Sequence, residues 1–68
     1  MSIWIIYSTD GVELGRAKAM HARTAFLLWH DPSPQSLSSV LASPNPDGSC
    51  EITYNGEVYT LVKEPGQV

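Results

Sequence analysis

The sequence has 68 residues, of which 43% are hydrophobic and 16% charged, with a net charge of −3. A chain of this length forms one small domain, because compact cores rarely divide below roughly 100 residues, and its apolar content excludes disorder along the whole chain. Seven acidic against four basic residues argue against a general nucleic-acid binder, since phosphate contacts need several cations on one surface.

The same composition indicates a reduced, cytoplasmic protein. Cys50 is the single cysteine, so it cannot form an internal disulfide, and small exported domains usually contain several. No apolar run approaches the roughly 18–20 residues that a membrane span requires. The N-terminus has no basic region ahead of an apolar stretch, which a secretory signal would need.

The first predicted element is a strand over residues 2–8, in which residues 3–7 are all β-branched or aromatic. One of its faces would carry Ile3, Ile5 and Tyr7, and the other Trp4 and Ile6. Both faces are apolar, whereas a strand with one face in water should alternate. We therefore expect this strand to be covered on both sides.

Asp10-Gly11 follows the strand and favours a two-residue hairpin turn. Such a turn would pair Tyr7 with Leu14 and return a short strand over residues 12–16. The alternative is a longer helix that begins at Gly11 and gives the order β-α-β-β. Glycines in its first turns would each weaken that helix by roughly 1 kcal/mol, so the hairpin is favoured.

A helix is predicted over the alanine-rich residues 17–30, ended by Asp31-Pro32. At 100° per residue, small and aromatic side chains gather on the side that would pack on a sheet: Ala19, Ala22, Ala25, Phe26 and Trp29. The opposite side carries Met20, Arg23, Leu27 and His30. The helix is thus apolar over more of its circumference than one buried stripe needs.

Residues 31–48 are rich in serine and proline and are expected to form a long connection. Within it, Ser33-Pro34 is typical of a helix start, and Leu37, Val40 and Leu41 form an apolar stripe. These residues predict a short helix that ends before Pro44. Residues 45–48, Asn-Pro-Asp-Gly, then predict a turn.

The last predicted element is a hairpin in which residues 50–54 and 57–63 flank Asn55-Gly56, a strong signal for a two-residue turn. That turn places three residues of the first strand, Cys50, Ile52 and Tyr54, opposite Leu61, Tyr59 and Glu57 on the expected core side. The opposite face holds Glu51, Thr53, Val58, Thr60 and Val62. Residues 64–68 are expected to be a flexible tail.

Together these elements predict an α+β domain over residues 1–63. The order would be β-β-α-(short α)-β-β, with both hairpins in one antiparallel sheet and the main helix on one face of it.

Catalytic and metal-binding patterns are weak. His21, His30 and Cys50 have no recognised zinc spacing, and a cysteine on the inward face of a strand behaves as a small hydrophobe. The acidic residues fall near turns or strand edges, where carboxylates are ordinarily solvated. We therefore expect no catalytic residue, metal or cofactor, and no enzymatic activity from this chain alone.

The surplus of apolar surface is the most informative feature, because exposed apolar patches on small proteins usually mark interaction surfaces. It predicts a protein partner or a homodimer, bound through Trp4, Ile6, Met20, Arg23, Leu27, His30, Val58, Thr60 and Val62. The leading hypothesis is a small non-enzymatic inhibitor that occupies a partner's surface. Phages and mobile elements encode such proteins, anti-CRISPR proteins among them.

Two other classes remain open. One is a weak nucleic-acid-binding or transcription-regulatory module, which would use Arg16, Lys18 and Arg23 as its basic patch. The other is an accessory subunit of an enzyme, with His21, His30 or Cys50 in a shared site.

Overall fold

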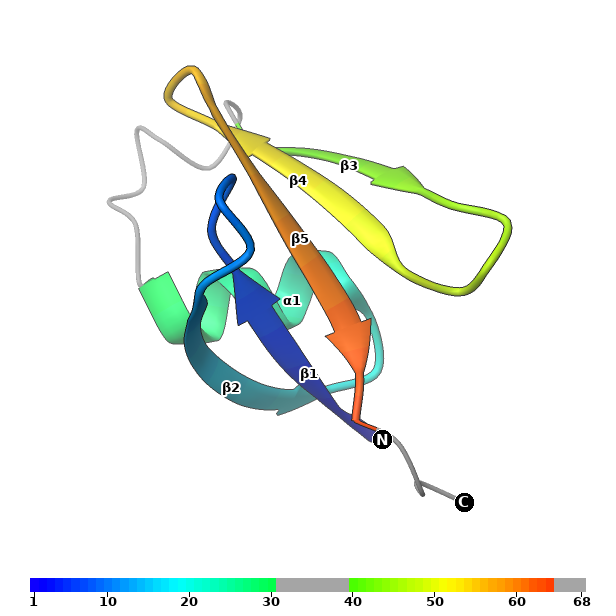
Figure 1. Cartoon of the computed structure of the whole chain (residues 1–68). Coiled ribbons are helices and arrows are strands. Elements are labelled where there is room, and N and C mark those ends of the chain that lie inside the picture. Colours follow the sequence, from blue (N-terminus) through cyan, green and yellow to red (C-terminus); the bar gives the residue numbers. More distant parts are fainter. Residues whose placement is uncertain (31–39, 65–68) are drawn as a thin grey trace.

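A five-stranded antiparallel sheet with one helix packed on it makes up the computed structural model, which describes residues 1–30 and 40–64 (Figure 1). The strands lie in the order β2-β1-β5-β4-β3. The elements, in chain order, are β1 (Ser2–Tyr7), β2 (Glu13–Ala19), α1 (Ala22–His30), β3 (Leu41–Pro44), β4 (Cys50–Tyr54) and β5 (Glu57–Lys63).

The N-terminal hairpin has a different turn from the predicted one. Ser8 accepts a hydrogen bond from the N–H of Gly11 (2.9 Å) and donates its own N–H to the carbonyl of Val12 (2.8 Å), and Gly11 has φ +84°. These bonds enclose a three-residue loop with glycine in the left-handed conformation. Tyr7 consequently pairs with Glu13, not Leu14, and Leu14 is an extra residue at a bulge in β2.

The helix begins later than its composition predicts. Residues 17–19 belong to β2, where Ala17 pairs with Trp4 and Ala19 with Ser2. The Trp4 indole Nε1 donates to the carbonyl of Ala19 at 3.2 Å, which ties the end of this strand to β1. Pairing along β1 thus overrides the weak helical preference of alanine and lysine.

The structure shows no helix at Val40 and Leu41, the end of the predicted short helix that it describes. Leu41–Pro44 forms the edge strand β3, which pairs with β4, and residues 31–39 lie outside the described part of the chain. Pro44 is compatible with an edge strand because its missing N–H faces away from the ladder. The turn predicted at residues 45–48 is present, with the N–H of Gly48 bonded to the carbonyl of Asn45 (3.1 Å).

The C-terminal hairpin has the predicted register. Cys50 pairs with Leu61, Ile52 with Tyr59 and Tyr54 with Glu57. Asn55 (φ 53°) and Gly56 (φ 82°) occupy the two left-handed positions of the turn. β5 also pairs with β1, so this hairpin joins the N-terminal one and places β5 at the centre of the sheet.

The core lies between α1 and one face of the sheet. Phe26, Ile6, Ile52 and Leu61 are its largest fully buried side chains. The Phe26 ring meets four other rings at centroid distances of 5.0–5.8 Å: Trp29, His30, Tyr54 and Tyr59. α1 approaches β2 closely at Gly15, which has no side chain and lies beneath the Trp29 indole.

The sequence predicts that Glu64 belongs to the tail, but in the structure Glu64 is hydrogen-bonded to the sheet. Its N–H donates to the carbonyl of Ile3 (2.8 Å), so the antiparallel pairing continues one residue past β5. Residues 65–68, the rest of the predicted tail, lie outside the described residues.

Candidate functional site: the open face of the sheet

The face of the sheet opposite α1 is not covered by any helix or strand within residues 1–30 and 40–64; Figure 1 shows α1 behind the sheet. Directly paired residues of neighbouring strands point to the same face. The pairings therefore place Ile5 beside Val62 and Tyr7 beside Thr60. They also place Thr53 of β4 between Val58 of β5 and Leu41 of β3. We call Tyr7, Thr53, Val58, Thr60 and Val62 the open-face patch.

Apolar groups are accessible over much of this patch. Val58 is 37% exposed and the neighbouring Leu41 63%, while the other four patch residues are half-buried. Thr9 Oγ1 donates to the carbonyl of Val58 (2.7 Å), which holds the N-terminal hairpin loop against the start of β5. The patch therefore lies on paired strands, with a hydrogen-bonded loop beside it.

One side of the open face is closed by an ionic bridge. Arg16 on β2 donates through Nε and Nη2 to the Glu13 carboxylate (3.2 and 3.3 Å) and through Nη1 to Glu64 Oε2 (2.9 Å). Because Glu64 follows β5 and Arg16 stands on β2, the bridge spans the intervening β1. Ile5 of β1 is only 5% exposed although no helix within residues 1–30 and 40–64 covers it.

The two carboxylates of the bridge also raise the pKa of Arg16. The hydrogen bonds and charge of Glu13, with a further bond from Glu64, hold the pKa of Arg16 above its ordinary value. Two carboxylates around one guanidinium leave the bridge with a net negative charge of one. The bridge lies beside the open-face patch along β2, with Glu13 opposite Tyr7 and Arg16 opposite Ile5.

Replacing Arg16 tests the bridge. Arg16→Gln should leave Glu13 and Glu64 to repel each other and should expose Ile5, lowering the melting temperature by about 2–5 °C at low salt. Thermal denaturation at low and high salt measures this, and the loss should shrink as salt screens the pairs. Lys18→Gln, on the same strand, is the matched control. Equal losses in both variants would contradict the bridge.

Two residues predicted to bind a partner are placed elsewhere by the structure. Trp4 is 5% exposed and Ile6 is fully buried, and both belong to the core beneath α1. They therefore take no part in the open face. The register explains the error: Trp4 pairs with Ala17 and Lys63, and Ile6 with Gly15 and Leu61, all on the helix side.

The residues on and around the helix that are predicted to bind a partner do not form one surface. Met20 is 70% exposed ahead of α1, whereas Leu27 packs partly against the core. Arg23 Nε donates to the carbonyl of Val40 at 3.4 Å. His30 stacks on Phe26 (5.4 Å between centroids) and meets Tyr54 edge-on (4.8 Å).

The structure does bring together three of the predicted partner-binding residues, which alternate along β5: Val58, Thr60 and Val62. The prediction missed Tyr7, Thr53, Ile5 and Leu41 as their neighbours. The sequence did divide β1 into the faces Ile3, Ile5, Tyr7 and Trp4, Ile6. Only the pairing of Ile5 with Val62 shows which of these faces lies beside Val62.

Chemistry-bearing side chains are dispersed over the described residues. No group of three or more histidine, cysteine, aspartate or glutamate side chains there could hold a metal ion. Cys50 is buried, and burial raises the pKa of its thiol, which keeps it protonated at neutral pH. Tyr59 also has a raised pKa, mainly through burial and then through its bond to Glu57.

Comparison with known proteins gives one partial likeness. A stretch of 51 residues, 74% of this chain, is 39% identical to cobyric acid synthase of Clostridium tetani (strain Massachusetts / E88). The chain spans 9% of that enzyme's length. No family model matches the chain, and the search of solved structures found no match.

No described helix is long and apolar enough to cross a membrane.

Proposed function

We propose that the protein is a small non-enzymatic interaction module that binds through the open face of its sheet. The observation that supports this is the position of the open-face patch. It lies on the central strand β5 and its neighbours β1 and β4, and no described element covers it. Exposed apolar groups on a rigid sheet are typical of interaction surfaces.

The occupant we propose is a second copy of the chain. Most charges of the open face stand at its β2 edge, where Arg16 is already paired with Glu13 and Glu64, and the middle of the face is uncharged. A twofold axis along β5 places the β2 side of one copy over the β3–β4 side of the other. The uncharged residues of the open-face patch then meet at the centre of the interface, and the ionic bridge of each copy lies at its edge.

The size of the face sets the expected affinity. Five strands about 4.8 Å apart, with residues rising about 3.3 Å, present on the order of 400 Å². That is about half of the ~800 Å² that each partner contributes to a standard interface. We therefore expect a weak dimer, with a Kd of about 10–100 μM.

Substitution on β5 tests the proposal. Val58→Glu places a charge near the start of β5, where the substituted residues of the two copies face each other across the proposed axis, and should weaken self-association by about tenfold or more. Sedimentation velocity over a concentration series measures the Kd. Leu28→Glu makes a similar change at a site on α1 that is 64% exposed and away from the patch. It should leave the Kd within about twofold.

Circular dichroism of both variants separates loss of association from loss of fold. A wild-type chain that stays monomeric at about 1 mM, well above the expected Kd, would overturn the proposed dimer. An equal loss in Val58→Glu and Leu28→Glu would overturn the assignment of the open face.

The biological role we propose for such a module is that of an inhibitor that occupies a target's surface, as phage and mobile-element inhibitors such as anti-CRISPR proteins do. Its small size and acidic charge support this role. A compact module of this kind acts by covering a surface and needs no chemistry of its own.

The likeness to cobyric acid synthase favours one second candidate, an accessory piece of a larger enzyme. In that case the chain would bind the enzyme it accompanies. Mixing it with the clostridial enzyme and following co-elution by size-exclusion chromatography tests this candidate. Separate elution at concentrations above about 100 μM would contradict it.

A further inference from the structure

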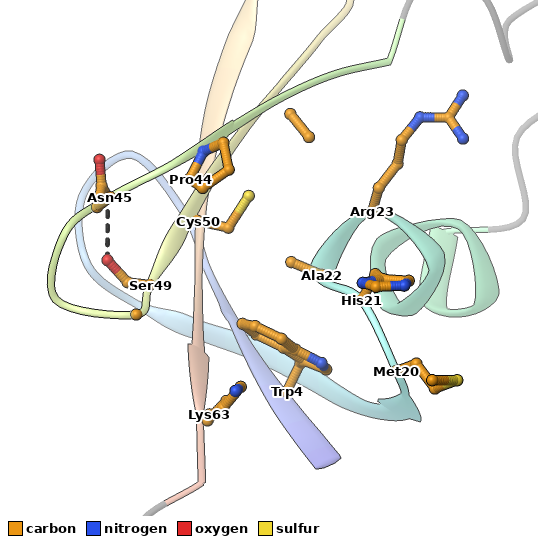
Figure 2. A pocket seen from close by; sticks show the side chains of 12 residues that line it. Trp4, Met20, His21, Ala22, Arg23, Pro44, Asn45, Ser49, Cys50 and Lys63 are labelled. Atoms are coloured by element: carbon orange, nitrogen blue, oxygen red, sulfur yellow. Dashed lines mark hydrogen bonds between the residues drawn. The ribbon is translucent and has the colours of Figure 1, made fainter. Parts of the chain in front are cut away.

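A cavity of about 300 Å³ lies on the other side of the sheet, between the β3–β4 hairpin and the start of α1. Trp4, Ala22 and Cys50, each no more than 6% exposed, line its inner part. In Figure 2 the Trp4 ring and the Cys50 thiol lie about one space that Ala22 borders from α1. Its volume is at the lower end of the range for small-molecule sites.

Cationic side chains gather around this cavity. Lys63 and Arg23, two of the four basic residues of the chain, line it together with the His21 imidazole. No aspartate or glutamate is among the described residues that line it. The acidic residue of the adjoining turn, Asp47, accepts bonds from the N–H and Oγ of Ser49 (2.9 and 2.6 Å). Asp47 borders a neighbouring hollow with Lys63, so the positive charge of this cavity comes from Lys63 and Arg23 together, in a molecule with a net charge of −3.

The apolar part and the charge are adjacent. Lys63 Nζ lies over the Trp4 ring, 5.5 Å from its centroid, and Figure 2 shows it directed toward that ring. The Trp4 Nε1–H is already bonded to the carbonyl of Ala19, so the indole is held in place. Cys50 adds an uncharged thiol. A ligand would meet an aromatic wall with an ammonium group at its edge.

We propose that this cavity binds a small apolar carboxylate. Its flat or aliphatic body lies against Trp4, Ala22 and Cys50, and its carboxylate pairs with Lys63 at the rim. A neutral apolar molecule would form no ion pair with the Lys63 ammonium, and a larger polar anion would place polar atoms against the apolar wall. The site is on the opposite side of the sheet from the open-face patch, so it goes beyond the proposed dimer and is independent of it.

A matched pair of probes tests the charge requirement. 2-Naphthoate and 2-naphthalenemethanol have the same ring system, but only the first is an anion at neutral pH. In an NMR titration of the amide and indole N–H signals, naphthoate should bind with a Kd of about 0.1–1 mM. It should shift the Trp4 indole and the Ala22 and Ser49 amides. The alcohol should bind about tenfold more weakly.

Two pairs of variants test the location. Lys63→Gln should weaken naphthoate binding about tenfold, whereas Lys18→Gln, the same charge change on β2 away from the cavity, should leave it unchanged. Ala42→Leu adds three carbons to a residue that lines the cavity. Ser43→Leu adds bulk on the next residue of β3, whose side chain points to the other face. Only the first should block binding.

Equal affinity for the acid and the alcohol, equal effects within either pair of variants, or no saturable shift at about 5 mM naphthoate would overturn the site. Should Lys63→Gln fail to fold, the β3 pair still decides the result. Loss of the dimer in the earlier test does not affect this one, because the two surfaces share no residue.

Discussion

Phe26→Ala should leave the protein largely unfolded at 25 °C. Phe26 has no exposed surface, and its ring meets the rings of Trp29, His30, Tyr54 and Tyr59. Its removal should cost about 3–5 kcal/mol in the free energy of unfolding through lost burial and an unfilled cavity. A domain of this size usually has only about 3–5 kcal/mol in total.

Urea denaturation followed by circular dichroism measures this loss. Leu28→Ala, on the same helix but 64% exposed, is the matched control and should change the free energy of unfolding by no more than about 0.5 kcal/mol. Phe26→Leu keeps much of the volume and should remain folded with a lower melting temperature. A Phe26→Ala variant as stable as Leu28→Ala would contradict the packing of α1 on the sheet.

Gly15→Ala should cost about 1–3 kcal/mol in the free energy of unfolding, although alanine is normally well tolerated. A Cβ on Gly15 would overlap Trp29 Nε1 and lie 2.7 Å from Trp29 Cδ1. Either the indole must leave its place beside Phe26 or α1 must move away from β2. The absence of a side chain at this position is what allows the close approach.

A double-mutant cycle isolates this contact. In a Trp29→Leu background the overlap is gone, so Gly15→Ala should become neutral or stabilising by about 0.5–1 kcal/mol. The coupling between the two sites should then be at least about 1 kcal/mol. Additive effects of the two substitutions would show that the indole does not lie on Gly15.

Short-range signals in the sequence predicted part of this fold well. Asn55-Gly56 determines both the turn and the register of the C-terminal hairpin, because a two-residue turn leaves one way to pair the flanking strands. The apolar side chains of Ala22, Ala25 and Phe26 share one side of a helix at helical spacing, and they are the buried residues of α1. Such features depend on neighbours a few residues away.

The errors arise where distant pairing decides the structure. Residues 17–19 have a composition suited to a helix but pair with β1. Leu41–Pro44 becomes a strand because β4 offers it an edge. The bulge at Leu14 follows from a three-residue loop that Asp10-Gly11 does not distinguish from a two-residue one. Local preferences are too small to resist these tertiary contacts.

The candidate site depends on the same long-range information. Alternation along β5 predicted that Val58, Thr60 and Val62 share a face. The pairing of β1 with β5 then decides that Tyr7 and Ile5, not Trp4 and Ile6, stand beside them. The cavity joins Lys63, Cys50 and Ala22, which no sequence spacing connects.

The most direct measurement of the open face as an interface is an isotope-filtered NOE experiment on a mixture of labelled and unlabelled chain. At about 1 mM, well above the expected Kd, a dimer stacked about an axis along β5 should give intermolecular signals between the Val58 methyl groups of the two copies and between their Val62 methyl groups. Intermolecular signals confined to Leu28 and the rest of α1, or none at all, would contradict the proposed interface.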